Sequence, residues 1–220
     1  LTDGALGRSN SMMAQGGLQL PLPDDESKRK FIGDILRSAR TDLDARMVKN
    51  FVEHVHDTIY MLEDWGLGLD RDERGVLVRR SAGGLSDPRI VSVRDQIGPA
   101  LIKLLRARVQ QCDLEIRQHV RVSGIRRQKP ASWILTLQQE GGGEDELEVP
   151  CVIVCTGGVT WREAQRRQQP TTNPRNDNHV LFDQLTAMGL PVVHYDFYQY
   201  QPFGIVDTAG GELGRCVPES

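Results

Sequence analysis

The sequence has few of the residues that build disulfide scaffolds, zinc sites or membrane spans. It contains four cysteines in 220 residues, and none of them forms a C-x-x-C pair or the spacing of a zinc site. Cys151 and Cys155 lie in an apolar run, where we expect small buried side chains in a reducing compartment. The five histidines do not cluster, so no metal is expected. No run reaches the ~20 apolar residues that span a bilayer, so we expect no direct membrane insertion.

The sequence also lacks a strong charge of either sign. Its 27 basic and 30 acidic residues give a formal net charge of -3, which offers no general attraction for nucleic acid. The first four residues are followed by polar sequence rather than by an apolar signal core, so we expect a cytoplasmic protein. No Ser/His/Asp or Cys/His arrangement stands out, which leaves hydrolase chemistry with little support.

Hydrophobic periodicity predicts helices at about residues 27–39, 42–65, 95–109, 160–167 and 178–188. Gly66 and Gly189 are expected to end two of them. The helix at 42–65 has apolar residues at spacings of three and four. We expect these residues to form its buried face: Val48, Phe51, Val52, Val55, Ile59 and Leu62.

The remaining apolar runs carry strand signals. Short strands are expected at residues 114–116, 120–126 and 133–137, before a glycine-rich hairpin break. Residues 147–155 form an apolar run, which predicts a strand buried on both faces of a parallel sheet. A last extended run covers residues 191–200. Together, these elements predict an α/β fold with α+β features.

Two segments end in a pair of glycines. The first is residues 9–17, with small polar residues before the glycines, and the second is residues 156–158, directly after the run at 147–155. Because glycine has no side chain, main-chain N–H groups at such turns can approach a ligand closely. The chain has no G-x-G-x-x-G stretch, with which a free-standing dinucleotide-binding domain would hold a pyrophosphate.

These segments resemble parts of the flavoprotein family that contains succinate dehydrogenase, fumarate reductase and L-aspartate oxidase. Residues 8–18 are similar to the family's second flavin-contacting segment, and residues 152–158 to its strand ending in A-T-G-G. Residues 171–174 match a T-T-N element, and residues 187–191 match the helix end that follows it. Residues 196–204 resemble the motif E-F-x-Q-x-H-P-T-G. The elements occur in the family's order across nearly the whole chain.

The resemblance implies an FAD site built by both glycine-ended segments and one strand between them. The residues expected to contact FAD are Ser9, Asn10, Ser11, Met12, Ala14, Gln15, Gly16, Gly17, Val122, Cys155, Thr156, Gly157 and Gly158. The implied architecture is a three-layer FAD-binding fold of the glutathione reductase type without its N-terminal dinucleotide turn. Residues 1–201 would be part of this domain and residues 202–220 the start of a capping domain. We therefore expect the chain to be a piece of a longer polypeptide.

One departure from the family concerns how FAD is held. Succinate dehydrogenases attach FAD covalently through a histidine in the first segment, and the corresponding residue here is Asn10. An asparagine cannot form that link. The resemblance therefore implies noncovalent FAD, as in L-aspartate oxidase.

Further departures concern the substrate. A family histidine that helps to hold a substrate carboxylate corresponds to Gln201, which can donate a hydrogen bond but cannot carry a positive charge. Phe203 stands where the family has threonine, and His179 begins a stretch that replaces G-D-G. Glu219 corresponds to a substrate-binding glutamate of relatives. The family's proton-shuttling arginine is expected beyond Ser220, so no catalytic residue is assigned within the chain.

The sequence favours an FAD-dependent oxidoreductase that transfers a hydride between a small carboxylate, such as succinate, fumarate or L-aspartate, and FAD. The alternative is a degenerate flavoprotein-like domain with an interaction or scaffolding role and no turnover, which the changes at Gln201 and Phe203 motivate. The isolated chain is expected to be inactive and to bind FAD weakly or not at all. An electron-transfer partner and a homo-oligomer are both left open.

A group of arginines has two interpretations. They draw an anionic substrate toward the site, or they are ordinary solvated charges balanced by nearby acids. The group consists of Arg79, Arg80, Arg89 and Arg94. Three tryptophans are expected to anchor hydrophobic cores rather than to stack on a ligand: Trp65, Trp133 and Trp161.

Overall fold

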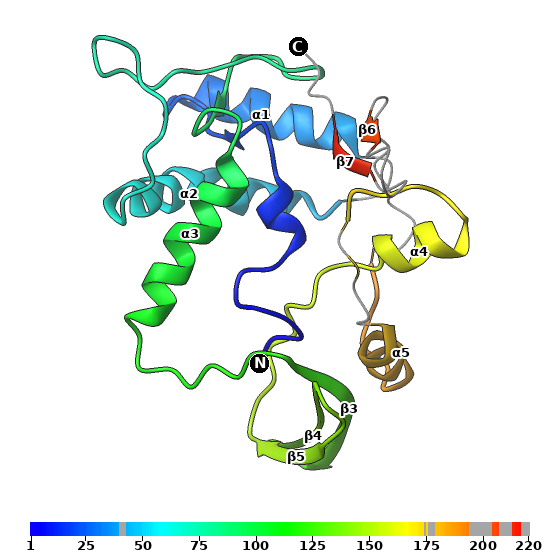
Figure 1. Cartoon of the computed structure of the whole chain (residues 1–220). Helices are drawn as coiled ribbons and strands as arrows, with labels where there is room; N and C mark the ends of the chain where they lie inside the picture. The colour runs from blue at the N-terminus through cyan, green and yellow to red at the C-terminus, as the bar shows by residue number, and fades with distance from the viewer. Residues whose placement is uncertain (40–42, 174, 176–178, 194–203, 207–212, 217–220) are drawn as a thin grey trace. The chain divides into compact units, whose positions relative to one another are not determined.

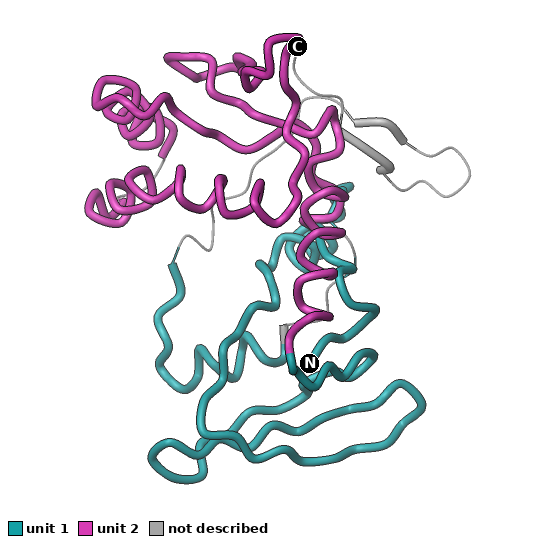
Figure 2. Tube along the Cα trace, turned by 90° about the vertical axis from the view of Figure 1, so that its left-hand side faces the viewer, with its two compact units in different colours: residues 1–10, 113–216 teal, residues 11–112, 217–220 magenta. Residues whose placement is uncertain are grey.

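The computed structural model describes residues 1–39, 43–173, 175, 179–193, 204–206 and 213–216 (Figure 1). The chain divides into two compact units, which are coloured separately in Figure 2. We call residues 11–112 the helical unit, and residues 1–10 with 113–216 the sheet unit. Each unit has a hydrophobic core of its own.

The helical unit is built from α1 (Asp25–Ser38), α2 (Ala45–Asp64), α3 (Ile97–Gln110) and a short β-ladder. In the ladder, β1 (Leu18–Gln19) pairs antiparallel with β2 (Ile90–Val91). The three helices confirm the predictions at 27–39, 42–65 and 95–109 to within a few residues. The buried core of this unit consists of Leu20, Val55, Ile59, Leu62, Leu67, Leu69, Val91 and Ile97.

Helix α2 buries most of the face that its apolar spacing predicts, with one exception. It begins after Asp44, whose carboxylate accepts a hydrogen bond from the N–H of Arg46 at 2.9 Å. It stops before Gly66, whose φ of 108° only glycine adopts easily, as predicted. The predicted inward residues that are buried are Val52, Val55, Ile59 and Leu62. The prediction was wrong for Phe51, which is 55% exposed and forms a T-shaped ring pair with Phe31 of α1 instead.

The sheet unit contains an antiparallel sheet in which β3 (Val120–Lys129), β4 (Ser132–Gln139) and β5 (Glu144–Val149) lie in that order. Helix α5 (His179–Ala187) packs on it through Leu181 and Leu185. Gln184 fixes this contact, because its Oε1 accepts a hydrogen bond from the N–H of Ile125 at 2.8 Å. Trp133 packs against this core, and Trp65 against that of the helical unit, as expected. Trp161 is part of neither core; the guanidinium carbon of Arg175 lies 6.0 Å from its ring centroid.

The other elements of the sheet unit are short. Helix α4 (Thr160–Arg166) lies near its predicted position, and Gly189, with φ of 83°, follows α5 as expected. Strand β6 (Gly204–Val206) pairs antiparallel with β7 (Leu213–Cys216). Most of the extended run predicted at 191–200 lies outside the described residues.

Two strand predictions were wrong. Residues 114–116 form no strand. The run at 147–155 is not one buried parallel strand, because β5 ends at Val149 and pairs antiparallel with β4. The physical reason is Pro150, which has no N–H to donate to a ladder.

The residues after Pro150 are exposed rather than buried. Ile153 is 85% exposed, and residues 151–158 belong to no strand. Cys151 and Cys155 are free and exposed, which contradicts the expectation that they are buried. No helix in the described part of the chain has the length and apolar character to cross a membrane.

A buried ion pair ties the helical unit together. Asp34 of α1 pairs with Arg89, and their side chains are 4% and 1% exposed. The N–H of Ser86 donates to Asp34 at 2.8 Å, and Arg89 Nε donates to Oε1 of Gln19 in β1 at 3.0 Å. The guanidinium carbon of Arg89 lies 4.7 Å from the ring centroid of Phe31. The pair therefore joins α1 to β1 and to the segment that leads into β2.

The pKa of Asp34 reflects this network. Burial by itself raises the pKa, but hydrogen bonds from Ser86 and Arg89 and the charge of Arg89 outweigh it and lower the pKa from 3.8 to about 2. Because the pKa is lowered on folding, the ionised carboxylate stabilises the fold at pH values above 3.8. That contribution is lost as the pH falls from there toward about 2.

We predict that Asp34→Asn destabilises the chain by about 3 kcal/mol, because it leaves the charge of Arg89 buried without a counter-ion. Asp87→Asn is the matched control, since Asp87 pairs with Lys30 at 3.3 Å on the surface and should contribute less than about 1 kcal/mol. Urea unfolding at pH 7 measures both changes. The acid-induced loss of stability between pH 4 and 2 should be smaller in Asp34→Asn than in the parent chain. Equal effects of the two variants at pH 7 would contradict the assignment.

Candidate functional site

The first glycine-ended segment is held in place by α3. Residues Asn10–Met13 form a short 3-10 helix, and the N–H of Ala14 donates to the carbonyl of Ser11 at 3.2 Å. The N–H of Gly98, in the first turn of α3, donates to the carbonyl of Ala14 at 3.1 Å. A Cβ on Gly98 would lie 2.3 Å from the carbonyl oxygen of Ser11, so only glycine permits this contact.

The two glycines at the end of this segment have different roles. Gly16 has φ of 72°, and a Cβ placed on it would meet nothing within 4 Å. A Cβ on Gly17 would lie 2.3 Å from the carbonyl oxygen of Val91, because the main chain here lies directly against β2. Gly17 is therefore required by packing within the helical unit. Gly16 is the residue that offers bare main chain to open space.

Most of the predicted contact residues in this segment are accessible to a ligand. Met12 is 40% exposed, and Asn10, Ser11, Ala14 and Gly16 are also exposed. Gln15 and Ser9 are half-buried.

The second glycine-ended segment lies in the sheet unit. Cys155, Thr156, Gly157 and Gly158 are exposed. Gly157 has φ of 75°, and a Cβ on Gly158 would meet nothing within 4 Å. Val122 is half-buried in β3, where it pairs with Leu137 and packs on the core of the sheet unit. The predicted FAD contacts are thus divided between the two units, and their joint site stays a prediction.

The structure does not describe the residues predicted to bind substrate. Gln201 and Glu219 lie outside the described residues, as does Phe203. The main chain of His179 begins α5, but its side chain is outside the described part. In that described part, no group of three or more His, Cys, Asp or Glu side chains could hold a metal ion.

The four arginines have separate roles. Arg89 is buried against Asp34, so neither interpretation of the group applies to it. Arg80 is exposed and pairs with Asp70 at 3.4 Å and Asp95 at 3.7 Å, which is the solvated surface charge of the second interpretation.

Of the other two, Arg79 is half-buried and donates to the carbonyl of Leu20, and burial lowers its pKa. Arg94 has φ of 51°, and its N–H donates to the carboxylate of Asp70 at 2.9 Å. The carboxylate of Asp70 therefore pairs with the side chain of Arg80 and accepts a hydrogen bond from the main chain of Arg94.

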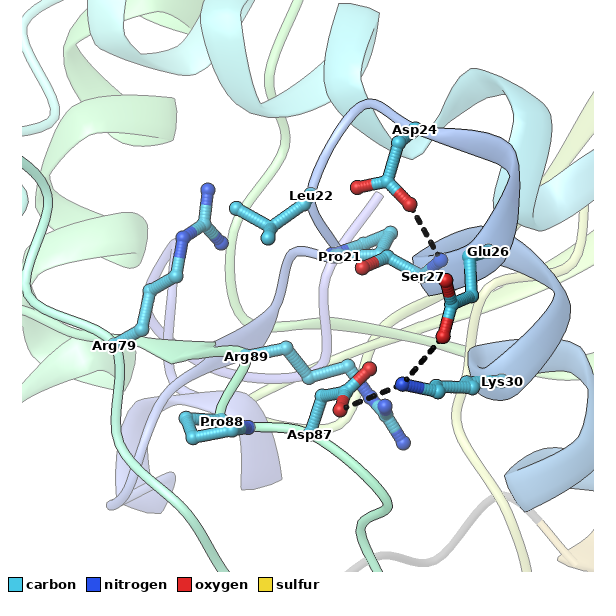
Figure 3. Close-up of a pocket in the computed structure, with 10 residues that line it drawn as sticks. All are labelled: Pro21, Leu22, Asp24, Glu26, Ser27, Lys30, Arg79, Asp87, Pro88 and Arg89. Carbon is cyan, nitrogen blue, oxygen red and sulfur yellow. Dashed lines mark hydrogen bonds and ion pairs between the residues drawn. The ribbon is translucent and has the colours of Figure 1, made fainter.

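A pocket of about 470 Å³ opens at the N-terminal end of α1 (Figure 3). Its charged lining residues are Asp24, Glu26, Lys30, Arg79, Asp87 and Arg89. Lys30 lies between Glu26 and Asp87, at 3.0 Å and 3.3 Å, and these partners raise its pKa. Because acids and bases balance, the pocket has no excess charge for an anionic ligand. None of the residues predicted to contact FAD lines it.

Sequence reasoning missed two features of the helical unit. One is Gly98, although a glycine followed by Pro99 at a helix start could have indicated a close main-chain contact. The other is the Asp34–Arg89 pair, for which the sequence carries no signal because the partners are 55 positions apart along the chain.

Comparison with known protein families shows which family the chain belongs to. Residues 1–215 match the FAD binding domain family. The chain belongs to this family. Its distant homologues are L-aspartate oxidases and the flavoproteins of succinate dehydrogenase and fumarate reductase.

The similarity to individual FAD binding domain proteins is low but extensive. An L-aspartate oxidase from Pyrococcus horikoshii is 26% identical over 199 residues, covering 90% of this chain and 39% of the relative. L-aspartate oxidase 2 from Ralstonia nicotianae is 25% identical over 195 residues, covering 88% of this chain and 35% of the relative. A solved E. coli quinol fumarate reductase chain is 22% identical, with a TM-score of 0.80 over 96% of this chain and 35% of that chain. The chain thus spans well under half the length of these relatives.

Family membership implies FAD, and the geometry within each unit fits this cofactor. A Cβ placed on Gly16 or on Gly158 would meet nothing within 4 Å, so each turn leaves room for a ligand beside the glycine. Exposed serine and asparagine side chains next to Gly16 can hydrogen-bond polar groups of a nucleotide. The mixed α/β fold agrees with the fumarate reductase match over the matched region.

The two glycines predict different responses to alanine. Gly17→Ala should lower the free energy of unfolding by about 2–3 kcal/mol, because its Cβ must displace the β2 main chain. Gly16→Ala should cost only about 1 kcal/mol, the strain of a left-handed residue with free space around it. Urea unfolding of the two variants is the measurement. A larger loss for Gly16→Ala would contradict the observed packing.

Proposed function

We propose that the chain is part of an FAD-dependent oxidoreductase that transfers a hydride between a small carboxylate and noncovalently bound FAD. Succinate, fumarate and L-aspartate are the candidate substrates, because the relatives include L-aspartate oxidases, a succinate dehydrogenase flavoprotein and a quinol fumarate reductase. The observation that carries the proposal is the pair of bare glycine turns at Gly16 and Gly158, in a chain of the FAD binding domain family.

The chain's own residues would bind and orient the cofactor. When bound, FAD supplies the redox chemistry at its ring system. The main chain around Gly16 and residues 156–158 would lie against it, and Ser9 and Ser11 would hydrogen-bond its polar groups. Asn10 holds the position that would need a histidine for a covalent link, so FAD would be exchangeable.

The proposed domain division follows from the same resemblance. Residues 1–201 would belong to a three-layer FAD-binding domain, and residues 202–220 would begin a capping domain that carries the substrate contact Glu219. Gln201 would orient a substrate carboxylate by hydrogen bonding. The lack of positive charge at this position weakens the hold on a second carboxylate, so a C4-dicarboxylate is bound less tightly than in relatives with histidine.

A degenerate domain with a scaffolding role is the second candidate. Three substitutions favour it: Gln201 for histidine, Phe203 for threonine and His179 at the G-D-G position. This candidate predicts that no succinate, fumarate or L-aspartate is turned over even when flavin is bound.

The flavin site can be tested with one matched pair of glycines. Gly16→Ala should weaken FAD binding at least about tenfold, because a methyl group would occupy the open face of the turn. Gly75→Ala is the control, since Gly75 also has positive φ and nothing within 4 Å, but lies outside the predicted site. The test uses the polypeptide translated from the complete reading frame, titrated with FAD. Equal losses in the two variants, or no flavin binding by the parent, would count against the proposal.

Acid precipitation of the flavin-loaded polypeptide tests the binding mode. We expect all flavin in the supernatant, because Asn10 cannot form a covalent link. Flavin retained in the protein pellet would refute noncovalent binding.

Gln201→His should tighten succinate or fumarate binding about tenfold below pH 6.5, because an imidazolium adds a charge-assisted hydrogen bond. Gln199→His, two residues away, is the control for adding a histidine nearby. The measurement is the change in flavin absorbance during titration with the dicarboxylate. Tightening that persists above pH 8 would show that charge is not the cause.

A further inference from the structure

The pocket at the N-terminal end of α1 takes no part in the proposed function (Figure 3). Its volume is about 470 Å³, and all of its lining residues belong to the helical unit. Three parts of that unit form it: the residues just before α1, the first two turns of α1, and Arg79 with residues 87–89. A pocket of this volume is large enough for a small organic molecule.

Most of the charged groups in the lining already have a counter-ion. Lys30 lies between Glu26 and Asp87, at 3.0 Å and 3.3 Å. Arg89 is paired with Asp34, which does not line the pocket. These groups hold one another in place, so they form the frame of the pocket.

Asp24 and Arg79 differ from this frame, because neither forms an ion pair within the described part of the chain. Asp24 accepts a hydrogen bond from the N–H of Ser27 at 2.9 Å, and this bond lowers the pKa of Asp24. The carboxylate is therefore ionised at neutral pH. Arg79 donates to the carbonyl of Leu20, which carries no charge. The lining thus contains one negative and one positive group that lack a counter-ion.

An apolar surface lies next to these two groups. In the view of Figure 3, the side chain of Leu22 stands between Arg79 and Asp24. Leu22 is 49% exposed, and the neighbouring Pro21 is buried. The two charged groups do not pair with each other, so each can contact one end of a bound molecule.

The wall of the pocket contains a further unmet donor. Arg89 lines the pocket, and its Nη1 atom is buried without a hydrogen-bond partner among the residues that the structure describes. A buried N–H group that has no acceptor is costly, and such groups are normally paired. An oxygen atom of a bound molecule beside the guanidinium would supply the acceptor.

We propose that this pocket binds a small aminocarboxylate as a zwitterion, with its carboxylate at Arg79, its ammonium group at Asp24 and its apolar stem along Leu22. Such a ligand has no net charge, which matches the balanced lining, and it supplies a counter-ion to both unpaired groups. A simple anion would neutralise Arg79 but would be repelled by Asp24. The inference does not rest on the proposed function, because no residue predicted to contact FAD lines the pocket.

Calorimetric titration of the polypeptide translated from the complete reading frame tests this site. The probes are glycine, 4-aminobutanoate and 6-aminohexanoate, which differ in the length of the apolar stem. Butanoate and butylammonium are the controls, since each carries only one of the two charges. We expect at least one aminocarboxylate to bind at least about tenfold more tightly than both controls, because it gains a second charge-assisted hydrogen bond. Its affinity should be the same with and without added FAD.

One variant removes the negative charge and keeps the helix cap. Asp24→Asn should weaken binding of the aminocarboxylate at least about tenfold, although asparagine caps a helix as well as aspartate does. Asp44→Asn is the matched control, because Asp44 caps α2 in the same way and does not line the pocket. This control should leave the affinity unchanged. Urea unfolding establishes that both variants are folded.

A second variant removes the positive charge. Arg79→Gln should also weaken binding at least about tenfold, while glutamine keeps a donor for the carbonyl of Leu20. Arg74→Gln is the control, since Arg74 is exposed and lies outside the lining. Arg79→Lys, which keeps the charge, should bind the ligand more tightly than Arg79→Gln.

Three results would overturn the proposal. Absence of binding by all three aminocarboxylates would show that the pocket is not a site for them. Equally tight binding of butanoate would show that the ammonium group is not recognised. Equal losses in Asp24→Asn and Asp44→Asn would show that the effect is not local to the pocket. A polypeptide that binds the aminocarboxylate but no flavin would contradict only the proposed function.

Discussion

The buried contact between Asp34 and Arg89 is the constraint on which the helical unit depends. Removing two charges from water is costly, and that cost is offset by the attraction of the pair and by hydrogen bonds to its remaining polar atoms. Here Ser86 and Gln19 supply hydrogen bonds and the face of Phe31 covers the guanidinium, while Nη1 of Arg89 has no hydrogen-bond partner among the described residues. The pair fixes the segment that leads into β2, and β2 in turn contacts Gly17. The position of the first glycine turn thus rests on an ion pair that does not touch the proposed site.

The sequence was sufficient to locate the helices, because an apolar stripe with a period of 3.6 residues needs no knowledge of its partner. For α2, the stripe of Val52, Val55 and Ile59 identified the buried face. Phe51 was assigned wrongly because a helix turns about 100° per residue, which places its ring at the margin of that face beside Phe31. Periodicity identifies a face, but not where the face ends.

Strands and sites were harder to predict, since each depends on a partner elsewhere in the chain. The run at 147–155 is apolar except for Glu148, yet Pro150 divides it into a part that pairs with β4 and a part that belongs to no strand. The double glycine at 16–17 suggested one role for both residues. In the structure, Gly17 is required because its main chain packs against Val91, whereas Gly16 has free space around it. Pro150 is visible in the sequence, whereas the difference between the two glycines is set by a main-chain contact with β2, which lies far along the chain.

The contact between Gly98 and residues 11–14 has a mechanical consequence. Helix α3 has 14 residues and is therefore about 21 Å long, and its first turn meets the loop without intervening side chains. At its other end, Arg108 lies over the ring of Trp65, 4.8 Å from the ring centroid. With no soft side chain to absorb movement at Gly98, a tilt of the helix must shift the loop as well. A small displacement near Arg108 would thus be transmitted through a rigid rod to the turn at Gly16.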